Sequence, residues 1–440
     1  MNTGRPVGFG LEELPCIVRG RGSWLFDAAG RRYLDGSGGP AAFSIGHGNV
    51  EVNTAIAAQL AEIACAYRYL FTSEALTRLT AMILTACGGD FGHIVFTSSG
   101  SEAMESALKL ALQYCTARGA ATRKHFIARQ RSYHGNTLGA LSVSGFPERR
   151  GPFEGSLLDV SFVSAANEYR PLRGVSPAEL VPHLAAELEA RILAVGPERV
   201  AAFVFEPVVG AAGGVVPAPP GYARAMREIC DRYEILLIAD EVMCGAGRCG
   251  TWCALAHDGI QADIMAVAKG LAGGYLPLAA TIFSRRVGET IIAKDGAFLT
   301  GHTFSGHTAA CAAAVAVQSI IERDELVARV HDKGPVLKGL LEESLRHFAA
   351  VGDIRGRGFL IGIEFVCDPH TKEPFPQERA FSHEVGRRAF EDGLICYPCG
   401  GHVDGRGDTV IIAPPYNATD DELGQIVEKF TGAVAAAVRA

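Results

Sequence analysis

No stretch of this 440-residue sequence is apolar over enough residues to cross a membrane. The longest clean apolar run, near residues 309–317, is far shorter than the roughly 20 residues that span a bilayer. Residues 1–10 lack the apolar segment of a secretory leader, so we expect neither a signal peptide nor a transmembrane helix. An excess of basic charge is also absent, because the formal net charge is −7. Nucleic acid, which usually needs a basic face, is therefore not an expected partner, and neither is a membrane.

Charged residues make up only 20% of the chain, while 48% of the residues are hydrophobic. This balance excludes intrinsic disorder and allows two or three structural units around a large core. The 12 cysteines are scattered, and several lie within apolar runs. Without a secretory leader they indicate buried thiols in a reducing, cytoplasmic setting rather than a disulfide framework.

Two groups of cysteines are the candidates for a metal site. Three cysteines fall within residues 244–253, and Cys396, Cys399 and His402 are spaced as in part of a zinc site. A structural zinc site normally needs a second pair at similar spacing, and the sequence offers none. We therefore expect packed or half-exposed thiols here and no metal.

Short β-like runs alternate with helical patterns between about residues 70 and 305. The runs are 93–97, 125–129, 200–206, 235–241 and 264–269. Each is followed by a Gly-rich turn or a helix-like segment, which predicts an α/β fold with a mostly parallel sheet covered on both faces. Ligands of such sheets bind beyond the carboxyl ends of the strands.

The rest of the chain predicts a second, smaller α+β domain. The alanine-rich stretch 308–322 predicts one long buried helix, and later segments alternate between helix-like and strand-like patterns. These segments are 332–348 (helix), 360–366 (strand), 381–392 (helix) and 419–439 (helix). We divide the chain into an N-terminal segment (1–65) that packs with the small domain, a large domain (66–325) and a C-terminal small domain (326–440).

The first chemical signal is a small-residue turn between a strand and a helix. Residues 97–103 read Thr-Ser-Ser-Gly-Ser-Glu-Ala, and Ser99 and Glu102 have the spacing of a capping box. A helix N-terminus after such a turn attracts anions, because free N–H groups and the helix dipole converge there. The pattern indicates phosphate binding, with a plain helix cap as the alternative.

Two further signals are charged residues at the ends of apolar strands. Asp240 closes a buried aliphatic run at the edge where ligands bind, although a solvated strand end would look the same. Lys269 also closes an apolar strand, before a Gly-rich stretch. Burial lowers the pKa of a lysine and suits it to Schiff-base chemistry, whereas a surface lysine is the alternative. Together with the phosphate-type turn, these residues are the parts that a pyridoxal phosphate site requires.

At this point the sequence resembles the class III aminotransferases, which have the fold type I architecture of pyridoxal-phosphate enzymes: a large, mostly parallel-sheet domain and a smaller α+β domain. The resemblance covers nearly the whole chain. Its specific elements are Ser99-Gly100-Ser101-Glu102-Ala103, Tyr133-His134-Gly135, Glu206-Pro207-Val208, Asp240-Glu241-Val242, Ala268-Lys269-Gly270 and His302-Thr303-Phe304-Ser305-Gly306-His307.

The resemblance implies a role for each residue around the cofactor ring. Lys269 would form the Schiff base and move the proton during the reaction. Asp240 would pair with the pyridine nitrogen, with Glu206 close by. Val242 would pack under the ring, and Tyr133 would stack on its other face.

The resemblance also implies how the phosphate is bound. Gly100 and Ser101 would hold it, and the motif positions Ser99 and His134 count among the expected cofactor-binding residues. Thr303 would reach the phosphate of the neighbouring subunit's cofactor. The active unit would then be a homodimer or a larger homo-oligomer.

The substrate side is where the sequence departs from part of the family. Arg355 matches an arginine that often grips a substrate carboxylate, with a surface ion pair as the alternative. Members that use 2-oxoglutarate often carry an acid in the stretch after Glu-Pro-Val, but residues 209–214 contain none. This favours pyruvate as acceptor. Another carboxylate-binding arginine common before the Ala-Pro-Pro strand has Tyr397 as its nearest match, with Arg406 in a nearby loop.

We therefore expect an aminotransferase that moves an amino group from an ω-amino acid, amine or diamine to a 2-oxo acid by a ping-pong mechanism. Two alternatives stay open. Decarboxylases, aminomutases, epimerases and phospholyases share this fold and most of these motifs. A non-catalytic protein could keep the fold, although it would have no need for Lys269, Asp240, Tyr133 and Thr303 together.

Overall fold

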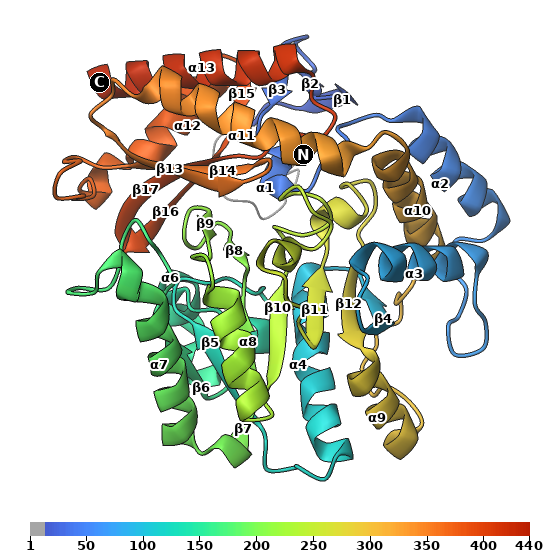
Figure 1. Cartoon of the computed structure of the whole chain (residues 1–440). Coiled ribbons are helices and arrows are strands. Elements are labelled where there is room, and N and C mark those ends of the chain that lie inside the picture. The colour runs from blue at the N-terminus through green and yellow to red at the C-terminus, as the bar shows by residue number, and fades with distance from the viewer. Residues whose placement is uncertain (1–13) are drawn as a thin grey trace, which may run out of the picture.

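The computed structural model describes residues 14–440 and has the predicted mixed α/β architecture, with a large and a small part (Figure 1). The expectation that residues 1–10 carry no secretory leader lies outside the described residues. Among residues 14–440, no helix combines the length and the apolar character that crossing a membrane requires.

The large part is built on a seven-stranded sheet in the order β4-β12-β11-β10-β7-β5-β6. All strands run parallel except β12, which is antiparallel to both of its neighbours. The strands are β4 (Phe91–Thr97), β5 (His125–Arg129), β6 (Val160–Val163), β7 (Val200–Phe205), β10 (Leu236–Asp240), β11 (Ile264–Val267) and β12 (Ala279–Ser284). The predicted parallel sheet is thus confirmed, and β6 and β12 are the strands that the sequence pattern missed.

Helices cover both faces of this sheet. One face carries α3 (Glu74–Cys87), α7 (Pro177–Val195), α8 (Tyr222–Arg232) and α10 (Thr308–Arg323), and the other carries α4 (Gly100–Ala117), α5 (Leu138–Ser142) and α9 (Arg285–Asp295). Along β10, Leu237 and Ala239 pack into the first core, whereas Leu236 and Ile238 pack into the second. A strand that is apolar on both sides is typical of a covered parallel sheet. The predicted buried helix at 308–322 is α10.

The small part joins an antiparallel sheet of four strands to three helices, which agrees with the predicted α+β pattern (upper left of Figure 1). The pattern predicted the three helices but only one of the four strands, at 360–366. The strands are β13 (Val351–Arg357), β14 (Leu360–Phe365), β16 (Tyr397–Val403) and β17 (Arg406–Ile412), and the helices are α11 (Leu326–Leu345), α12 (Phe381–Glu391) and α13 (Asp420–Arg439). Helix α11 begins earlier than the predicted 332. The left-handed backbone of Glu325 turns the chain from the end of α10 directly into a new helix.

A third sheet joins the N-terminal strands to a strand of the small part, in the order β1-β2-β3-β15. Strand β3 pairs in parallel with β15, and Leu34 lies opposite Leu394. Its strands are β1 (Ile17–Arg21), β2 (Trp24–Asp27), β3 (Arg32–Asp35) and β15 (Leu394–Ile395). The remaining elements are α1 (Gly38–Ala41), α2 (Val50–Glu62), α6 (Pro147–Arg150), β8 (Val208–Val209), β9 (Val216–Pro217) and the short 3-10 helices Gly151–Ser156, Pro197–Arg199, Ala254–Asp258, Lys269–Leu271 and Gln377–Arg379. We keep the division at residues 65 and 325 as a proposal.

Candidate active site

The carboxyl ends of the parallel strands border a cavity of about 520 Å³, where ligands of such sheets bind. Most of the predicted site residues line it. They are Ser99, Gly100, Ser101, Tyr133, His134, Glu206, Asp240, Val242 and Lys269. Residues separated by up to 170 positions in the chain therefore share one cavity, because each follows a strand of the same sheet.

One end of the cavity is the N-terminus of α4. Ser99 caps this helix, since its Oγ accepts a hydrogen bond from the Glu102 N–H at 3.2 Å, and Glu102 accepts one from the Ser98 N–H at 2.7 Å. At Gly100, a Cβ would lie 2.8 Å from Cγ1 of Val242, so only glycine lets the helix end pack this closely against that side chain. The other first-turn N–H groups and the helix dipole favour an anion such as a phosphate.

Asp240 is the last residue of β10 and is almost fully buried beside the cavity. Its Oδ2 lies 2.8 Å from Nδ1 of His134, and its Oδ1 accepts a hydrogen bond from the Val242 N–H at 2.9 Å. The other ring nitrogen of His134 is buried and has no hydrogen-bond partner within residues 14–440. This arrangement makes the ring a donor to Asp240 and holds that carboxylate in one orientation.

A second carboxylate, Glu206, follows β7. It accepts hydrogen bonds from the backbone N–H groups of Tyr133 and Gly210, both at 2.9 Å. Burial raises the pKa of the Glu206 carboxyl, with His134 opposing that rise and Asp240 adding to it. Glu206 thereby fixes the backbone that carries Tyr133 into the cavity.

Lys269 stands two residues beyond β11 and has a left-handed backbone with φ of +45°. Its half-buried side chain lines the cavity. Burial lowers the pKa of its amine, while the charges of Asp240 and Glu206 oppose that fall. A lysine with a lowered pKa holds more neutral amine at neutral pH and is a better nucleophile and base.

These features fit pyridoxal phosphate. The cofactor has a phosphate, a ring nitrogen and a carbonyl carbon. The cavity has a helix N-terminus for the phosphate, a buried carboxylate for the ring nitrogen and a lysine for the carbonyl carbon. Tyr133 and Val242 also line the cavity and can contact the ring. Gly100 lines the cavity as well, and its lack of a side chain lets the helix end pack directly against Val242.

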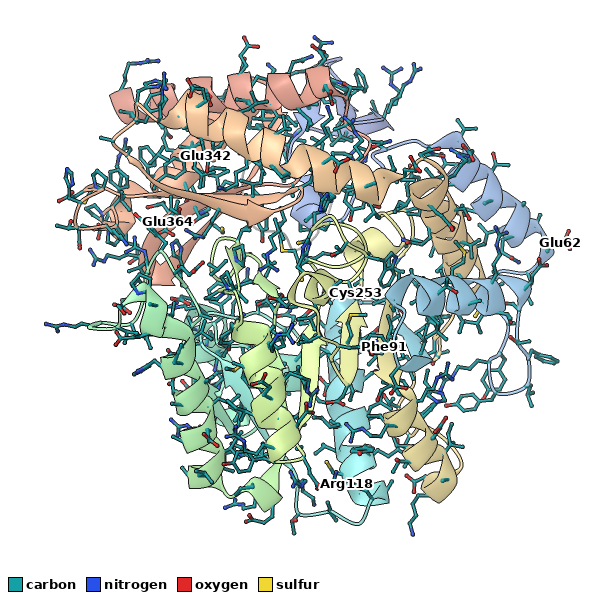
Figure 2. The ribbon with its side chains drawn as sticks, viewed as in Figure 1. Glu62, Phe91, Arg118, Cys253, Glu342 and Glu364 are labelled. Carbon is teal, nitrogen blue, oxygen red and sulfur yellow. The ribbon has the colours of Figure 1, made fainter. Side chains whose placement is uncertain are left out.

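Arg355 lies away from this cavity, on β13. All five of its N–H groups are used within the protein. They donate to the Asp353 and Glu364 carboxylates at 3.0 and 2.6 Å, and to the backbone carbonyls of Gly213, Gly214 and Val215. Glu364, which Figure 2 labels on the small sheet, is fully buried. The expected grip of Arg355 on a substrate carboxylate is therefore not supported, because no donor is free and the side chain does not reach the cavity.

We expect Arg355→Met to lower the free energy of unfolding by about 3–5 kcal/mol, because it breaks the buried pair with Glu364 and removes the donor from three backbone carbonyls, while Arg170 still pairs with Glu364 at 2.6 Å. The KM for substrate should stay within about twofold of wild type, because Arg355 does not line the cavity, whereas the loss of a binding contact of about 1.4 kcal/mol would raise KM about tenfold. Urea denaturation and steady-state kinetics on the same preparations check this. A tenfold rise in KM at unchanged stability would restore Arg355 as the substrate-binding residue.

Other sequence candidates also lie outside the cavity. Thr303 is exposed on the loop before α10, beside the exposed ring of Phe304. Arg406 is an exposed residue that pairs with Glu373 at 2.7 Å. Within the described part of the chain, no group of three His, Cys, Asp or Glu side chains is placed to hold a metal ion.

Sequence reasoning missed several residues that complete the cavity wall. Phe146 and Arg149 lie at and just after the turn from α5 into α6, and Met243 and Leu278 come from turns beside β10 and β12. Tyr397 at the start of β16, noted only as a match to an arginine position, lines the wall too. Nothing in their local sequence marks these residues, because only the fold brings them together.

Known proteins resemble this chain over nearly its full length. The family model for Aminotransferase class-III matches residues 11–434. An uncharacterized aminotransferase of Bacillus subtilis, YodT, is 40% identical over 423 residues, which is 96% of this chain and 95% of that protein. A diaminobutyrate–2-oxoglutarate transaminase of Halomonas elongata is 34% identical over 425 residues, covering 95% and 89%. The crystal structure of an (S)-enantioselective omega-transaminase from Thermomicrobium roseum superposes with a TM-score of 0.91 at 34% identity, covering 97% and 93%.

Proposed function

This chain belongs to the class III aminotransferases, which depend on pyridoxal phosphate, and we propose that it transfers an amino group from an ω-amino acid, amine or diamine to a 2-oxo acid. The mechanism is ping-pong, so the oxo product of the donor leaves before the acceptor enters. The observation that carries this proposal is the meeting of Lys269, Asp240 and the N-terminus of α4 in one cavity.

Bound pyridoxal phosphate supplies an electron sink for the amino carbon of the substrate. Lys269 holds the cofactor and carries a proton between the substrate Cα and C4′ of the cofactor. Its lowered pKa keeps more of the amine in the neutral form that accepts a proton. Asp240, oriented by His134, would accept a hydrogen bond from the ring nitrogen and keep that nitrogen protonated.

The remaining cofactor contacts are assigned as the family motifs imply. Tyr133 would stack on one face of the ring and Val242 would pack against the other, and both residues line the cavity. Ser99, Gly100 and Ser101 hold the phosphate at the capped end of α4. Glu206 supports the Tyr133 segment through its backbone hydrogen bond.

A homodimer or a larger homo-oligomer is proposed as the active unit, with Thr303 reaching the phosphate in the partner's site. Support comes from exposed apolar side chains around the same loop, where Leu299 and Phe304 are 71% and 59% exposed. Residues 67–71 add further exposed rings, and Arg68 packs against Gly301 of that loop. Exposed apolar patches of this kind mark protein interfaces. We also propose a cytoplasmic location, since the described cysteines are all free thiols.

Pyruvate is the proposed acceptor in preference to 2-oxoglutarate. The turn after β8 holds Ala211 at the cavity wall where a switching glutamate would be expected, and residues 209–214 contain no acid. Without that acid, an arginine cannot be alternately paired and released for the second carboxylate of 2-oxoglutarate.

The test is a pair of half-reactions on the purified holoenzyme. A panel of ω-amino acids, diamines, amines and α-amino acids is added first, and the absorbance of the bound cofactor is followed. Pyruvate or 2-oxoglutarate is added next. We expect a donor to remove the aldehyde-form band and pyruvate to restore it. A band that no donor removes, or that one removes without recovery, would instead indicate a decarboxylase, epimerase or lyase.

A further inference from the structure

Arg149 stands at the mouth of the cavity. It lies on the short helix α6, lines the cavity and is exposed to solvent at the same time. Lys269 is the other strongly basic side chain among the described residues that line this cavity, and the proposed function commits it to the cofactor. Arg149 is therefore the cation that remains for a substrate.

The charged side chains next to Arg149 in the sequence form hydrogen bonds with other groups. The carboxylate of Glu148 accepts a hydrogen bond from Nη1 of Arg131 at 3.0 Å. The same nitrogen donates to the carbonyl of Gly401 in β16 at 2.8 Å. These two contacts link α6 to the small sheet (Figure 1). Arg150 donates to backbone carbonyls of α5, among them that of Leu141 at 3.1 Å.

Arg149 itself has no such partner. Within residues 14–440 its side chain forms no salt bridge or hydrogen bond, and its guanidinium carbon lies 6.0 Å from the centre of the Phe146 ring. Arginine presents a planar fork that matches a carboxylate, so a free arginine at a cavity mouth is suited to bind one.

The charge of Arg149 also affects the tyrosine hydroxyls that line the cavity. Burial raises the pKa of the Tyr133 and Tyr397 hydroxyls, and in both cases the Arg149 guanidinium opposes that rise. Between these polar groups the wall is largely apolar, with Phe146, Met243 and other hydrophobic side chains. Such a wall suits a chain of methylene groups.

We propose that Arg149 binds the carboxylate at the far end of an ω-amino acid donor, so that ω-amino acids are preferred over amines and diamines of the same length. This inference rests on the proposed function, in which the amino group of the donor reacts beside Lys269. Lys269 is half-buried and Arg149 is exposed, so a carboxylate at the mouth must be separated from the amino group by a carbon chain. A diamine would place an ammonium beside the guanidinium, and like charges repel.

The experiment compares 4-aminobutyrate, 5-aminopentanoate and 6-aminohexanoate with the n-alkylamines of the same lengths. The kcat/KM of the first half-reaction is measured from the cofactor absorbance of wild-type, R149M and R149K holoenzyme. For the best acid, we expect R149M to lower the ratio of acid to amine kcat/KM by about 10- to 100-fold, the range for a hydrogen bond to a charged group. R149K should keep part of the ratio, because the charge remains while the fork is lost.

A binding measurement supports the kinetics without any reaction. Calorimetric titration of the holoenzyme with hexanoate and with hexanamide should show tighter binding of the acid by wild type and equal binding by R149M. R173M is the matched control, since Arg173 is also an exposed arginine but does not line the cavity, and it should behave as wild type.

The outcomes separate this inference from the proposed function. Transamination with an unchanged ratio in R149M overturns the assignment of Arg149 and leaves the proposed function standing. If no donor changes the wild-type absorbance, the proposed function fails, while the calorimetry still tests Arg149. If R149M slows only the second half-reaction with 2-oxoglutarate, the carboxylate belongs to the acceptor, and the donor assignment is overturned.

Discussion

Replacing Lys269 with alanine is expected to lower kcat for transamination by about 10⁴-fold or more, the combined loss of a base and of a covalent attachment point. No other side chain of the described cavity wall supplies a primary amine. The rate is measured by following oxo-acid formation with the best donor. Borohydride reduction followed by peptide mass spectrometry should locate the cofactor on the wild-type peptide that contains Lys269 and on no peptide of the variant.

Two further measurements make this result specific. Added methylamine should restore part of the rate of Lys269→Ala, because a small free amine can carry the proton that the side chain carried. The matched control is Lys294→Ala, which removes an exposed lysine on α9 and should keep kcat within about twofold, as surface substitutions usually do. Turnover by Lys269→Ala at more than about a tenth of the wild-type rate would refute the assignment.

Asp240→Asn should lower kcat by about 10²- to 10³-fold, the usual effect of removing one electrostatic group that stabilises a transition state. Asparagine has nearly the same shape and keeps one oxygen that can accept the hydrogen bond from Nδ1 of His134. Its amide NH2 replaces the oxygen that accepts from the Val242 N–H, so the variant loses the negative charge and one backbone hydrogen bond. The ring nitrogen of the cofactor then has no carboxylate to keep it protonated. Single-turnover kinetics and the pH dependence of the cofactor absorbance both report this change.

Glu241→Gln is the matched control for Asp240→Asn, because Glu241 is the next residue, is equally buried and does not line the cavity. Its carboxylate accepts hydrogen bonds from the N–H groups of Ala254 and Leu255 at 2.5 and 3.0 Å. Burial raises the pKa of Glu241 to about 7, so the loss of its charge is a small change at neutral pH. The amide NH2 of glutamine gives up one of the two backbone hydrogen bonds, which matches the structural loss in Asp240→Asn. We expect its kcat to fall less than threefold. Equal losses in the two variants would mean that Asp240 acts only by holding the structure.

The part of the site that the sequence predicts well is the part that depends on strand ends. Asp240 and Lys269 close apolar runs, and the carboxyl ends of parallel strands meet at one edge, so their proximity follows from the pattern itself. The cap at Ser99 is equally local, since it depends on Glu102 three residues later. The mostly parallel sheet follows from the alternation of strands and helices, and only the short β6 and the antiparallel β12 escape it.

The rest depends on contacts that no local pattern encodes. The guanidinium of Arg355 donates hydrogen bonds to backbone carbonyls about 140 residues away in the chain. The sequence around Arg355 does not indicate these partners. Arg149 differs from its neighbour Arg150 only in what the fold brings near each guanidinium. Charge alone cannot distinguish a free arginine from a structural one, so the residue proposed to bind the substrate carboxylate is identified only by the three-dimensional structure.

The pairing of β3 with β15 has a consequence for how the chain is made. The Gly36 N–H donates to the carbonyl of Ile395, and the Ala413 N–H donates to the carbonyl of Gly36, so the first strands are completed by residues synthesised some 360 positions later. At about 5–20 residues per second, the N-terminal strands wait roughly 20–70 s on the ribosome with an unpaired edge. Such edges template aggregation while they are open. Among the described strands, β3 therefore waits longest in synthesis for the strand that covers its edge.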